Sequence, residues 1–221
     1  MRLFVAIYFS KEIEEELTKI QTKLSQIGVK PNKNIHMTLK FLGEVEENDI
    51  EKIKVSLSKI KFKKFKIKLT NLGYFSPQQI RIVYCDVETN NCLNELANEI
   101  DKATAHIKSE TKFKSHITIN RVKNLKNKKE FIDKLRDIKV PSLNCDIDGF
   151  CLVKSDLKHR ESTSLKTSSY ELESGFATVL KDGRVSEANK PQVSDRWSLP
   201  SLTKEGPEYE ILEKFCAQRA Q

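Results

Sequence analysis

The stretch Ile35-His36-Met37-Thr38-Leu39-Lys40-Phe41-Leu42 alternates apolar and polar side chains from its first residue to Phe41. Successive side chains of a β-strand point to opposite faces of the sheet, so this alternation predicts a strand. One predicted face carries His36 and Thr38 side by side. The other face supplies the core with Ile35, Met37, Leu39 and Phe41. An imidazole and a hydroxyl are therefore expected together on a surface that points away from the core.

A second segment, His116-Ile117-Thr118-Ile119-Asn120, repeats this arrangement with His116 and Thr118 on one face. Each segment is the middle strand of a predicted strand-helix-strand-helix-strand series. The first series covers residues 3–9, 10–28, 35–42, 50–60 and 65–69, and the second covers 80–87, 93–107, 115–122, 127–138 and 143–153. Such a duplication predicts two similar halves whose equivalent strands meet.

These elements predict an α+β fold with two lobes. Duplicated β-α-β-α-β halves would form two antiparallel sheets that face a central cleft, with the helices outside. We expect residues 1–157 and 201–221 to form this domain, with a last strand within residues 206–215. Residues 158–200 lack isoleucine and any clear helical or strand period, which predicts a low-order insertion. A small hairpin around Lys181-Asp182-Gly183 is the alternative for this segment.

Composition indicates a soluble globular protein that attracts polyanions. The chain has 221 residues, 38% of them hydrophobic, and a formal net charge of +8, which favours RNA as a partner. The apolar start is only about seven positions long, too short for a signal sequence or a membrane span. Five cysteines without Cys-x-x-Cys spacing predict neither disulfides nor a zinc ribbon. We therefore expect a reduced, cytoplasmic monomer that does not associate with membranes.

Two histidines on facing strands suit a displacement at phosphorus. One imidazole takes a proton from the attacking oxygen and the other gives a proton to the leaving oxygen. The hydroxyls of Thr38 and Thr118 can donate hydrogen bonds to the non-bridging phosphate oxygens. A 2',3'-cyclic phosphate fits this chemistry, because its ring is strained and its leaving group is a sugar hydroxyl.

Two other interpretations of these histidines compete with this one. A single His-x-Thr segment is more often a histidine without a chemical role, but two copies at equivalent places favour a functional pair. A metal site could use His36 and His116 as two ligands, yet no Asp, Glu or Cys has the spacing of a third. We therefore expect no metal and no cofactor. We interpret the remaining histidines, His106 and His159, as surface residues.

The sequence resembles the 2H phosphoesterase superfamily, and within it the RNA 2',3'-cyclic phosphodiesterase family formerly named 2'-5' RNA ligases. The resemblance covers residues 1 to about 157 and resumes at about 202. The segments that carry it are Met1-Arg2-Leu3-Phe4-Val5-Ala6-Ile7, His36-Met37-Thr38-Leu39-Lys40-Phe41-Leu42-Gly43-Glu44, Leu72-Gly73-Tyr74-Phe75-Ser76-Pro77 followed by Ile80-Arg81-Ile82-Val83, His116-Ile117-Thr118-Ile119-Asn120-Arg121-Val122-Lys123, Lys154-Ser155-Asp156-Leu157 and Gly206-Pro207-Glu208-Tyr209-Glu210. Residues 158–200 separate the last two segments, which usually lie within a few residues of each other.

The resemblance implies a role for each residue of the two motifs. His36 would be the proton donor to the leaving O3' atom, and His116 would be the base that activates water. Thr38 and Thr118 would hold the phosphate oxygens, and the product would be an RNA 2'-phosphate. Weak reverse 2'-5' RNA ligation would accompany this hydrolysis.

Arg121 and Tyr74 are further candidates for contact with the substrate. Strict alternation from His116 places Arg121 on the opposite face of its strand, unless the strand bulges. Tyr74 and Phe41 could stack on a base, although core packing is favoured for Phe41. Lysines at 61, 63, 64, 66 and 68 could follow an RNA backbone, and a solvated strand face is the commoner explanation.

Two further functions remain open from the sequence. The same site could hydrolyse 2'-5' linked oligonucleotides or cyclic nucleotide derivatives. Alternatively, the chain could bind RNA ends without turnover, although both histidines and both threonines are intact, which argues against this. Comparing hydrolysis of the different substrates separates the enzyme hypotheses, and tight binding without product would support the binding protein.

Overall fold

The computed structural model describes residues 1–25, 29–76, 78–88, 91–107, 113–123, 125, 127–156 and 207–218. These residues belong to one compact unit. The predicted insertion at 158–200, together with the alternative hairpin around Lys181, lies outside the described residues.

The described chain forms four helices and two antiparallel sheets, which confirms the α+β class. In chain order the elements are β1 (Arg2–Ile7), α1 (Lys11–Ser25), β2 (Lys30–Pro31), β3 (Met37–Glu44), α2 (Glu47–Ser58), β4 (Phe65–Phe75), β5 (Ile82–Glu88), α3 (Asn91–Ala103), β6 (His116–Arg121), α4 (Lys128–Asp137), β7 (Asn144–Ile147), β8 (Gly149–Asp156) and β9 (Glu208–Cys216).

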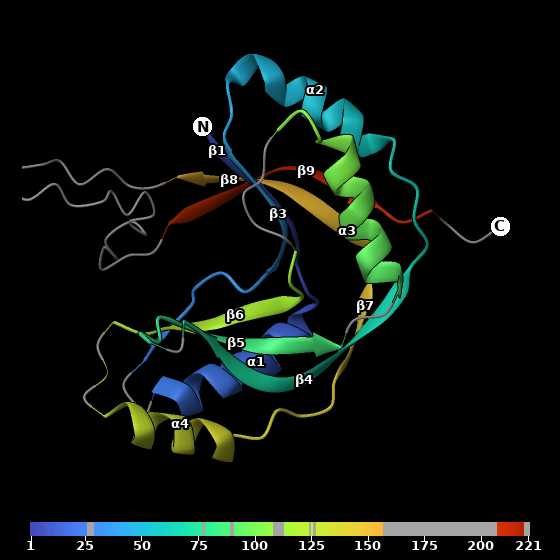
Figure 1. Ribbon diagram of the computed structural model, residues 1–221. Helices are drawn as coiled ribbons and strands as arrows, with labels where there is room; N and C mark the ends of the chain where they lie inside the picture. Colours follow the sequence, from blue (N-terminus) through green and yellow to red (C-terminus); the bar gives the residue numbers. More distant parts are fainter. Residues whose placement is uncertain are drawn as a thin grey trace, which may run out of the picture. The chain divides into compact units, whose positions relative to one another are not determined.

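The two halves of the chain exchange strands (Figure 1). One sheet has the order β3-β1-β8-β9 and the other has the order β2-β6-β5-β4-β7. In each sheet the middle strand of one half pairs with the first strand of the same half. That first strand then pairs with the last strand of the other half, which gives the equivalent series β3-β1-β8 and β6-β5-β4. Both sheets therefore need both halves of the chain.

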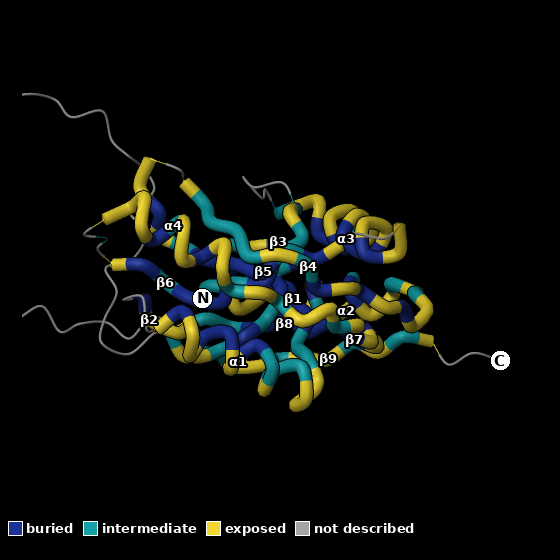
Figure 2. The backbone as a smooth tube through the Cα atoms, turned by 90° about the horizontal axis from the view of Figure 1, so that it is seen from below, coloured by how far each residue is buried: buried dark blue, intermediate teal, exposed yellow. Residues whose placement is uncertain are grey.

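The first helix of each half also packs against the other half. Helix α1 contacts β6 and β2, whereas α3 contacts β3 and α2. The amphipathic pattern of α1 is the reason for this packing, because Leu17, Ile20 and Leu24 lie on one helix face and are buried. In Figure 2 the buried residues lie mainly along the interior strands, and the exposed residues lie mainly on the outer faces of the helices.

The predicted strand at residues 143–153 is wrong in one respect, because it consists of two strands in different sheets. β7 pairs with β4, and β8 lies between β1 and β9. Only Asp148 separates them. Gly149 permits this abrupt transfer, since a Cβ atom there would lie 2.7 Å from the backbone oxygen of Phe215. An apolar period alone cannot show which sheet a strand joins.

β4 continues to Phe75, beyond the predicted range of 65–69. Its pairing with β5 shifts register between Leu69 and Leu72, so the polar residues Thr70 and Asn71 lie within the strand at an irregularity. The two-residue strand β2 was not predicted from the sequence.

Candidate functional site

The two histidine strands meet although they belong to different sheets. β3 contacts β6. His116 is the first residue of β6, and His36 immediately precedes β3. The duplicated pattern thus brings both His-x-Thr segments to one place, which we call the histidine site: His36, Thr38, His116, Thr118, Arg121 and Tyr209.

β3 bulges directly after its His-x-Thr segment. Two consecutive residues of β1 pair with Thr38 and Lys40, which leaves Leu39 without a partner on β1. The extra residue reverses the alternation of side chains, so Lys40 is buried and Phe41 is 50% exposed. The expectation that Phe41 packs in the core is therefore wrong, because strict alternation does not continue through a bulge.

β6 has an equivalent bulge. Two consecutive residues of β5 pair with Thr118 and Asn120, which leaves Ile119 without a partner on β5. Asn120 is fully buried, whereas Arg121 is partly exposed again. Strict alternation would place Arg121 on the opposite face from His116. The bulge returns Arg121 to the face that carries His116.

His36 is held in one orientation by the backbone. Its Nδ1 atom lies 2.9 Å from the carbonyl oxygen of Asn34. A carbonyl oxygen only accepts hydrogen bonds, so Nδ1 carries the hydrogen and Nε2 is left for chemistry. The rings of Phe4, Tyr8 and Tyr209 surround the imidazole, with centroid separations of 5.1, 5.8 and 5.3 Å respectively.

Burial among these rings lowers the pKa of His36 to about 4. The hydrogen bond to the Asn34 carbonyl opposes this shift, whereas the charges of Arg121 and His116 reinforce it. His116 and Arg121 belong to β6, which contacts β3, the strand that follows His36. The contact between these strands joins residues from the two halves of the chain.

His116 repeats the same backbone contact. Its Nδ1 atom lies 2.8 Å from the carbonyl oxygen of Lys114, so its Nε2 atom is also left for chemistry. The rings of Phe75 and Tyr84 lie 4.8 and 5.5 Å away, both edge to face. Burial lowers the pKa of His116, the charge of Lys114 acts in the same direction, and Asp86 opposes it.

The threonines and Tyr74 differ in their placement. Thr38 and Thr118 are partly buried, and neither hydroxyl donates to another described residue. Tyr74 packs against the main hydrophobic core, and its neighbour Phe75 is the residue that lies against His116. The structure does not bring Tyr74 to the histidine rings.

Tyr209 on β9 is a site residue that the sequence did not identify. Its ring lies edge to face against Phe4 at 5.2 Å and against His36 at 5.3 Å. Burial raises the pKa of Tyr209, and the charge of Arg121 and a hydrogen bond with it oppose this shift. Tyr209 lies in the Gly206-Pro207-Glu208-Tyr209-Glu210 segment, which resembles the family. That resemblance is the feature of the sequence that could have identified Tyr209.

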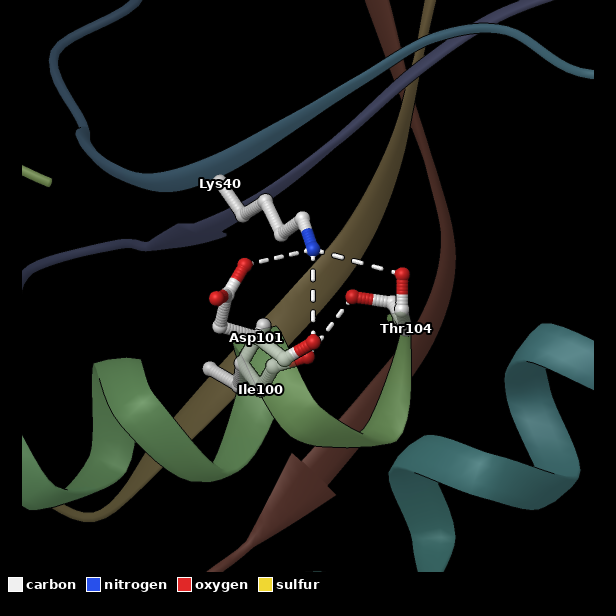
Figure 3. Close-up of polar contacts among 4 residues, drawn as sticks. All are labelled: Lys40, Ile100, Asp101 and Thr104. Carbon is white, nitrogen blue, oxygen red and sulfur yellow. Dashed lines mark hydrogen bonds and ion pairs between the residues drawn. The ribbon is translucent and has the colours of Figure 1, made fainter. Parts of the chain in front are cut away.

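A buried lysine fixes the bulge of β3 (Figure 3). The Nζ atom of Lys40 lies 2.6 Å from the Asp101 carboxylate, 3.3 Å from the Thr104 carbonyl oxygen and 3.4 Å from the Asp101 carbonyl oxygen. These carbonyls end helix α3, where the helix dipole is negative, so they compensate the buried charge. The hydroxyl of Thr104 donates to the Ile100 carbonyl at 2.6 Å and completes the network.

The bulge of β6 is held in an equivalent way. Gln21 of α1 is buried and donates to the carbonyl oxygens of Ile119 at 2.8 Å and Asn32 at 2.7 Å. Gln21 precedes His36 by the same number of residues as Asp101 precedes His116. Each bulge is thus fixed by the first helix of the opposite half.

The described residues contain no group of three or more His, Cys, Asp or Glu side chains placed to hold a metal ion. None of the helices in that part of the chain is long and apolar enough to cross a membrane.

Comparison with known proteins agrees with the duplicated architecture. The model of the family described as "LigT like Phosphoesterase" matches the chain twice, at residues 7–84 and 85–161. Together these matches cover more than half of the chain.

Curated relatives and solved structures give the same result. An RNA 2',3'-cyclic phosphodiesterase of Methanocaldococcus jannaschii is 38% identical over 144 residues, covering 63% of this chain and 82% of the relative. One from Thermotoga maritima is 32% identical over 166 residues, covering 71% and 88%. The fold is shared with TT0787 of Thermus thermophilus (TM-score 0.63, 24% identity, 98% and 97% coverage) and with E. coli LigT in its apo form (0.63, 18%, 99% and 98%). The chain belongs to the LigT-like phosphoesterase family.

Proposed function

We propose that this protein hydrolyses RNA 2',3'-cyclic phosphate ends to 2'-phosphomonoesters by acid and base catalysis with two histidines. One observation carries the proposal. The strand that follows His36 contacts the strand that begins at His116, and both histidines give their Nδ1 hydrogen to a backbone carbonyl, which leaves two Nε2 atoms for proton transfer. Family relatives named RNA 2',3'-cyclic phosphodiesterase support the choice of substrate.

In the proposed reaction His116 is the proton acceptor and His36 is the proton donor. Neutral His116 takes a proton from water through Nε2 while the water oxygen attacks phosphorus. The bond from phosphorus to O3' breaks, and O3' receives the proton on Nε2 of charged His36. The product carries a 2'-phosphate and a free 3'-hydroxyl, and the two histidines have exchanged protonation states.

His36 must gain a proton before it can act as the acid. Its pKa of about 4 means that it is mainly neutral near pH 7 in the free protein. A bound cyclic phosphate carries a negative charge, which offsets the charge of Arg121 and stabilises the imidazolium form. Substrate binding would thus raise the pKa of His36 and favour its protonated form, which acts as the acid.

Thr38, Thr118 and Arg121 would bind the phosphate. The hydroxyls of Thr38 and Thr118 would donate to its non-bridging oxygens, one from each half of the chain. Arg121 would add a charge-assisted hydrogen bond as negative charge develops on those oxygens. An RNA 5'-hydroxyl in place of water would give weak 2'-5' ligation by the same proton transfers.

The test is incubation of purified protein, in EDTA, with a short RNA that ends in a 2',3'-cyclic phosphate. Wild type should form the 2'-phosphate, and His36→Ala and His116→Ala should each lose at least about 100-fold in rate, the usual contribution of one acid or base. His106→Ala is the matched control, because His106 is exposed, and it should keep full activity.

Three outcomes would contradict this proposal. Folded wild type that binds the RNA end without forming product would instead support a binding protein. Faster hydrolysis of a 2'-5' linked oligonucleotide or a cyclic nucleotide derivative would change the substrate. Loss of activity in EDTA that added metal restores would overturn the two-histidine mechanism.

A further inference from the structure

The side chain of Asn32 links the two His-x-Thr segments through backbone carbonyls. Its Nδ2 atom donates to the carbonyl oxygen of Asn34 at 2.9 Å and to the carbonyl oxygen of Thr118 at 3.2 Å. A carbonyl oxygen cannot donate, so the NH2 end of the amide is the end that faces both. This nitrogen carries two hydrogens, one for each carbonyl. One side chain thus joins the segment before His36 to the second motif.

The Asn34 carbonyl is the group that orients His36. It accepts the Nδ1 hydrogen of His36 at 2.9 Å and an amide hydrogen of Asn32 at the same distance. A carbonyl oxygen has two lone pairs, so it can accept both bonds. Three hydrogen bonds in series therefore connect the Thr118 backbone, through Asn32 and Asn34, to the imidazole of His36.

Asn32 is itself fixed to β6. Its backbone N–H donates to the carbonyl oxygen of Ile119 at 2.9 Å, and its own carbonyl oxygen accepts a hydrogen bond from the buried Gln21 at 2.7 Å. The preceding residue, Pro31, pairs with Asn120 in the short strand β2. The backbone and the side chain of Asn32 therefore both follow the position of the β6 bulge.

His36 needs such a link because it lies just outside its strand. The ladder between β1 and β3 begins at Met37, opposite Ile7. The position of the imidazole therefore depends on the loop at residues 32–35 as well as on β3. A misplacement of about 1 Å in a reacting group can cost about 100-fold in rate, so a tie within this loop has consequences for catalysis.

We propose that Asn32 is a positioning residue that sets the distance between Nε2 of His36 and the phosphate held by the second motif. This inference rests on the proposed function, in which Thr118 binds the phosphate and His36 protonates O3'. Asn32 acts through the two carbonyls and does not touch the reacting atoms. Loss of its amide releases the Asn34 carbonyl from Thr118, so the imidazole meets O3' less often in the geometry that proton transfer requires. The step that suffers is protonation of the leaving atom.

The experiment uses two RNAs whose cyclic phosphates differ in one atom. One ends in the normal 2',3'-cyclic phosphate, and the other has sulfur in place of O3'. When the bond from phosphorus to sulfur breaks, sulfur keeps the bonding electrons and leaves as a thiolate, which needs no proton from an acid. Asn32→Ala should lower kcat about 10- to 100-fold on the normal RNA, with little change in KM.

On the sulfur-containing RNA the variants should separate according to the step they affect. Asn32→Ala and His36→Ala should each approach the wild-type rate, because the acid is no longer needed. His116→Ala should stay slow, since the attacking water still needs a base. This pattern would assign the effect of Asn32 to the acid.

Asn127→Ala is the matched control, because the Asn127 side chain also bonds a backbone group, the N–H of Glu130 at 3.2 Å, at the start of α4. It should lower the free energy of unfolding without changing kcat on either RNA. Equal losses on both RNAs in Asn32→Ala would show a structural effect and overturn the inference. Full activity of Asn32→Ala on the normal RNA would overturn it as well.

The same measurements distinguish failure of the inference from failure of the proposed function. Wild type that hydrolyses neither RNA would refute the proposed function itself. His36→Ala that stays slow on the sulfur-containing RNA would remove His36 from the role of acid, and the inference would fall with it. Both results differ from an active wild type with a rescued His36→Ala and an Asn32→Ala that is not rescued, which would refute the role of Asn32 alone.

Discussion

His36 and His116 have the same backbone contact but differ in burial, and this difference predicts their titration. In the free protein the His36 pKa should be about 4, because surrounding rings disfavour its charged form. A bound nucleoside 2'-monophosphate should raise this pKa, since its negative charge favours the imidazolium. Histidine ring signals followed by NMR from pH 3.5 to 8, with and without the nucleotide, would measure the shift.

The exposed His106 reports any general effect of the added anion in the same spectra. Thr38→Val provides a second control, because it should weaken nucleotide binding without removing the rings that bury His36. If the pKa of His36 stays unchanged when the nucleotide is bound, substrate binding does not favour the protonated form of His36. That result would contradict its role as the acid.

The sequence predicts the histidine site only as far as the first residues of each motif. Alternation is regular from His36 to Thr38, and again from His116 to Thr118, so these four side chains lie on the predicted faces. Each strand then bulges, and the bulge depends on contacts with a helix far away in the sequence. For that reason the positions of Phe41 and Arg121 could not be derived from the period of two.

Among the helices and strands, the contact of Lys40 with the end of α3 is the interaction that fixes β3. Lys40→Met should destabilise the protein by about 1–3 kcal/mol, because it leaves buried carbonyls without a donor. Asp101→Asn should cost less, about 1 kcal/mol or below, since the Asp101 side chain is 71% exposed. Urea unfolding measures both changes as a lower free energy of unfolding.

Lys52→Met is the matched control for this prediction. Lys52 makes an ion pair of similar length with Asp49, but on the exposed surface of α2, so its loss should stay within about 0.5 kcal/mol. Lys40→Arg should keep part of the stability, because a guanidinium can still donate to the helix end. A Lys40→Met variant as stable as the Lys52→Met variant would show that the helix end does not need this cation.

Helices with a regular spacing of apolar residues were predicted well. Strands whose ends depend on which sheet they join were not. The apolar faces of α1 and α3 are buried as their spacing predicts, because a helix carries its own periodicity. The division of residues 143–153 into β7 and β8 arises instead from the partners available on each sheet. A local pattern contains no information about those partners.

For the whole molecule, the exchange of strands makes β9 part of the site although a long segment precedes it. β9 pairs with β8 along its length, with Asp156 opposite Glu208, and it carries Tyr209 to His36. Adjacent antiparallel strands can be joined by a short turn of about two to five residues. Replacing residues 157–207 by Gly-Asn-Gly-Lys should therefore leave the fold and the hydrolysis of cyclic phosphate largely unchanged.

A chain that ends at residue 156 is the matched comparison, because it also lacks the segment but loses β9. It should lose most activity, since it exposes the edge of β8 and removes Tyr209 from His36 and Arg121. Circular dichroism and thermal unfolding establish whether each variant folds before its rate is measured. Equal activity in the two variants would mean that β9 is not needed for catalysis. Loss of activity in a well-folded short-turn variant would assign a catalytic contribution to residues 157–207 themselves.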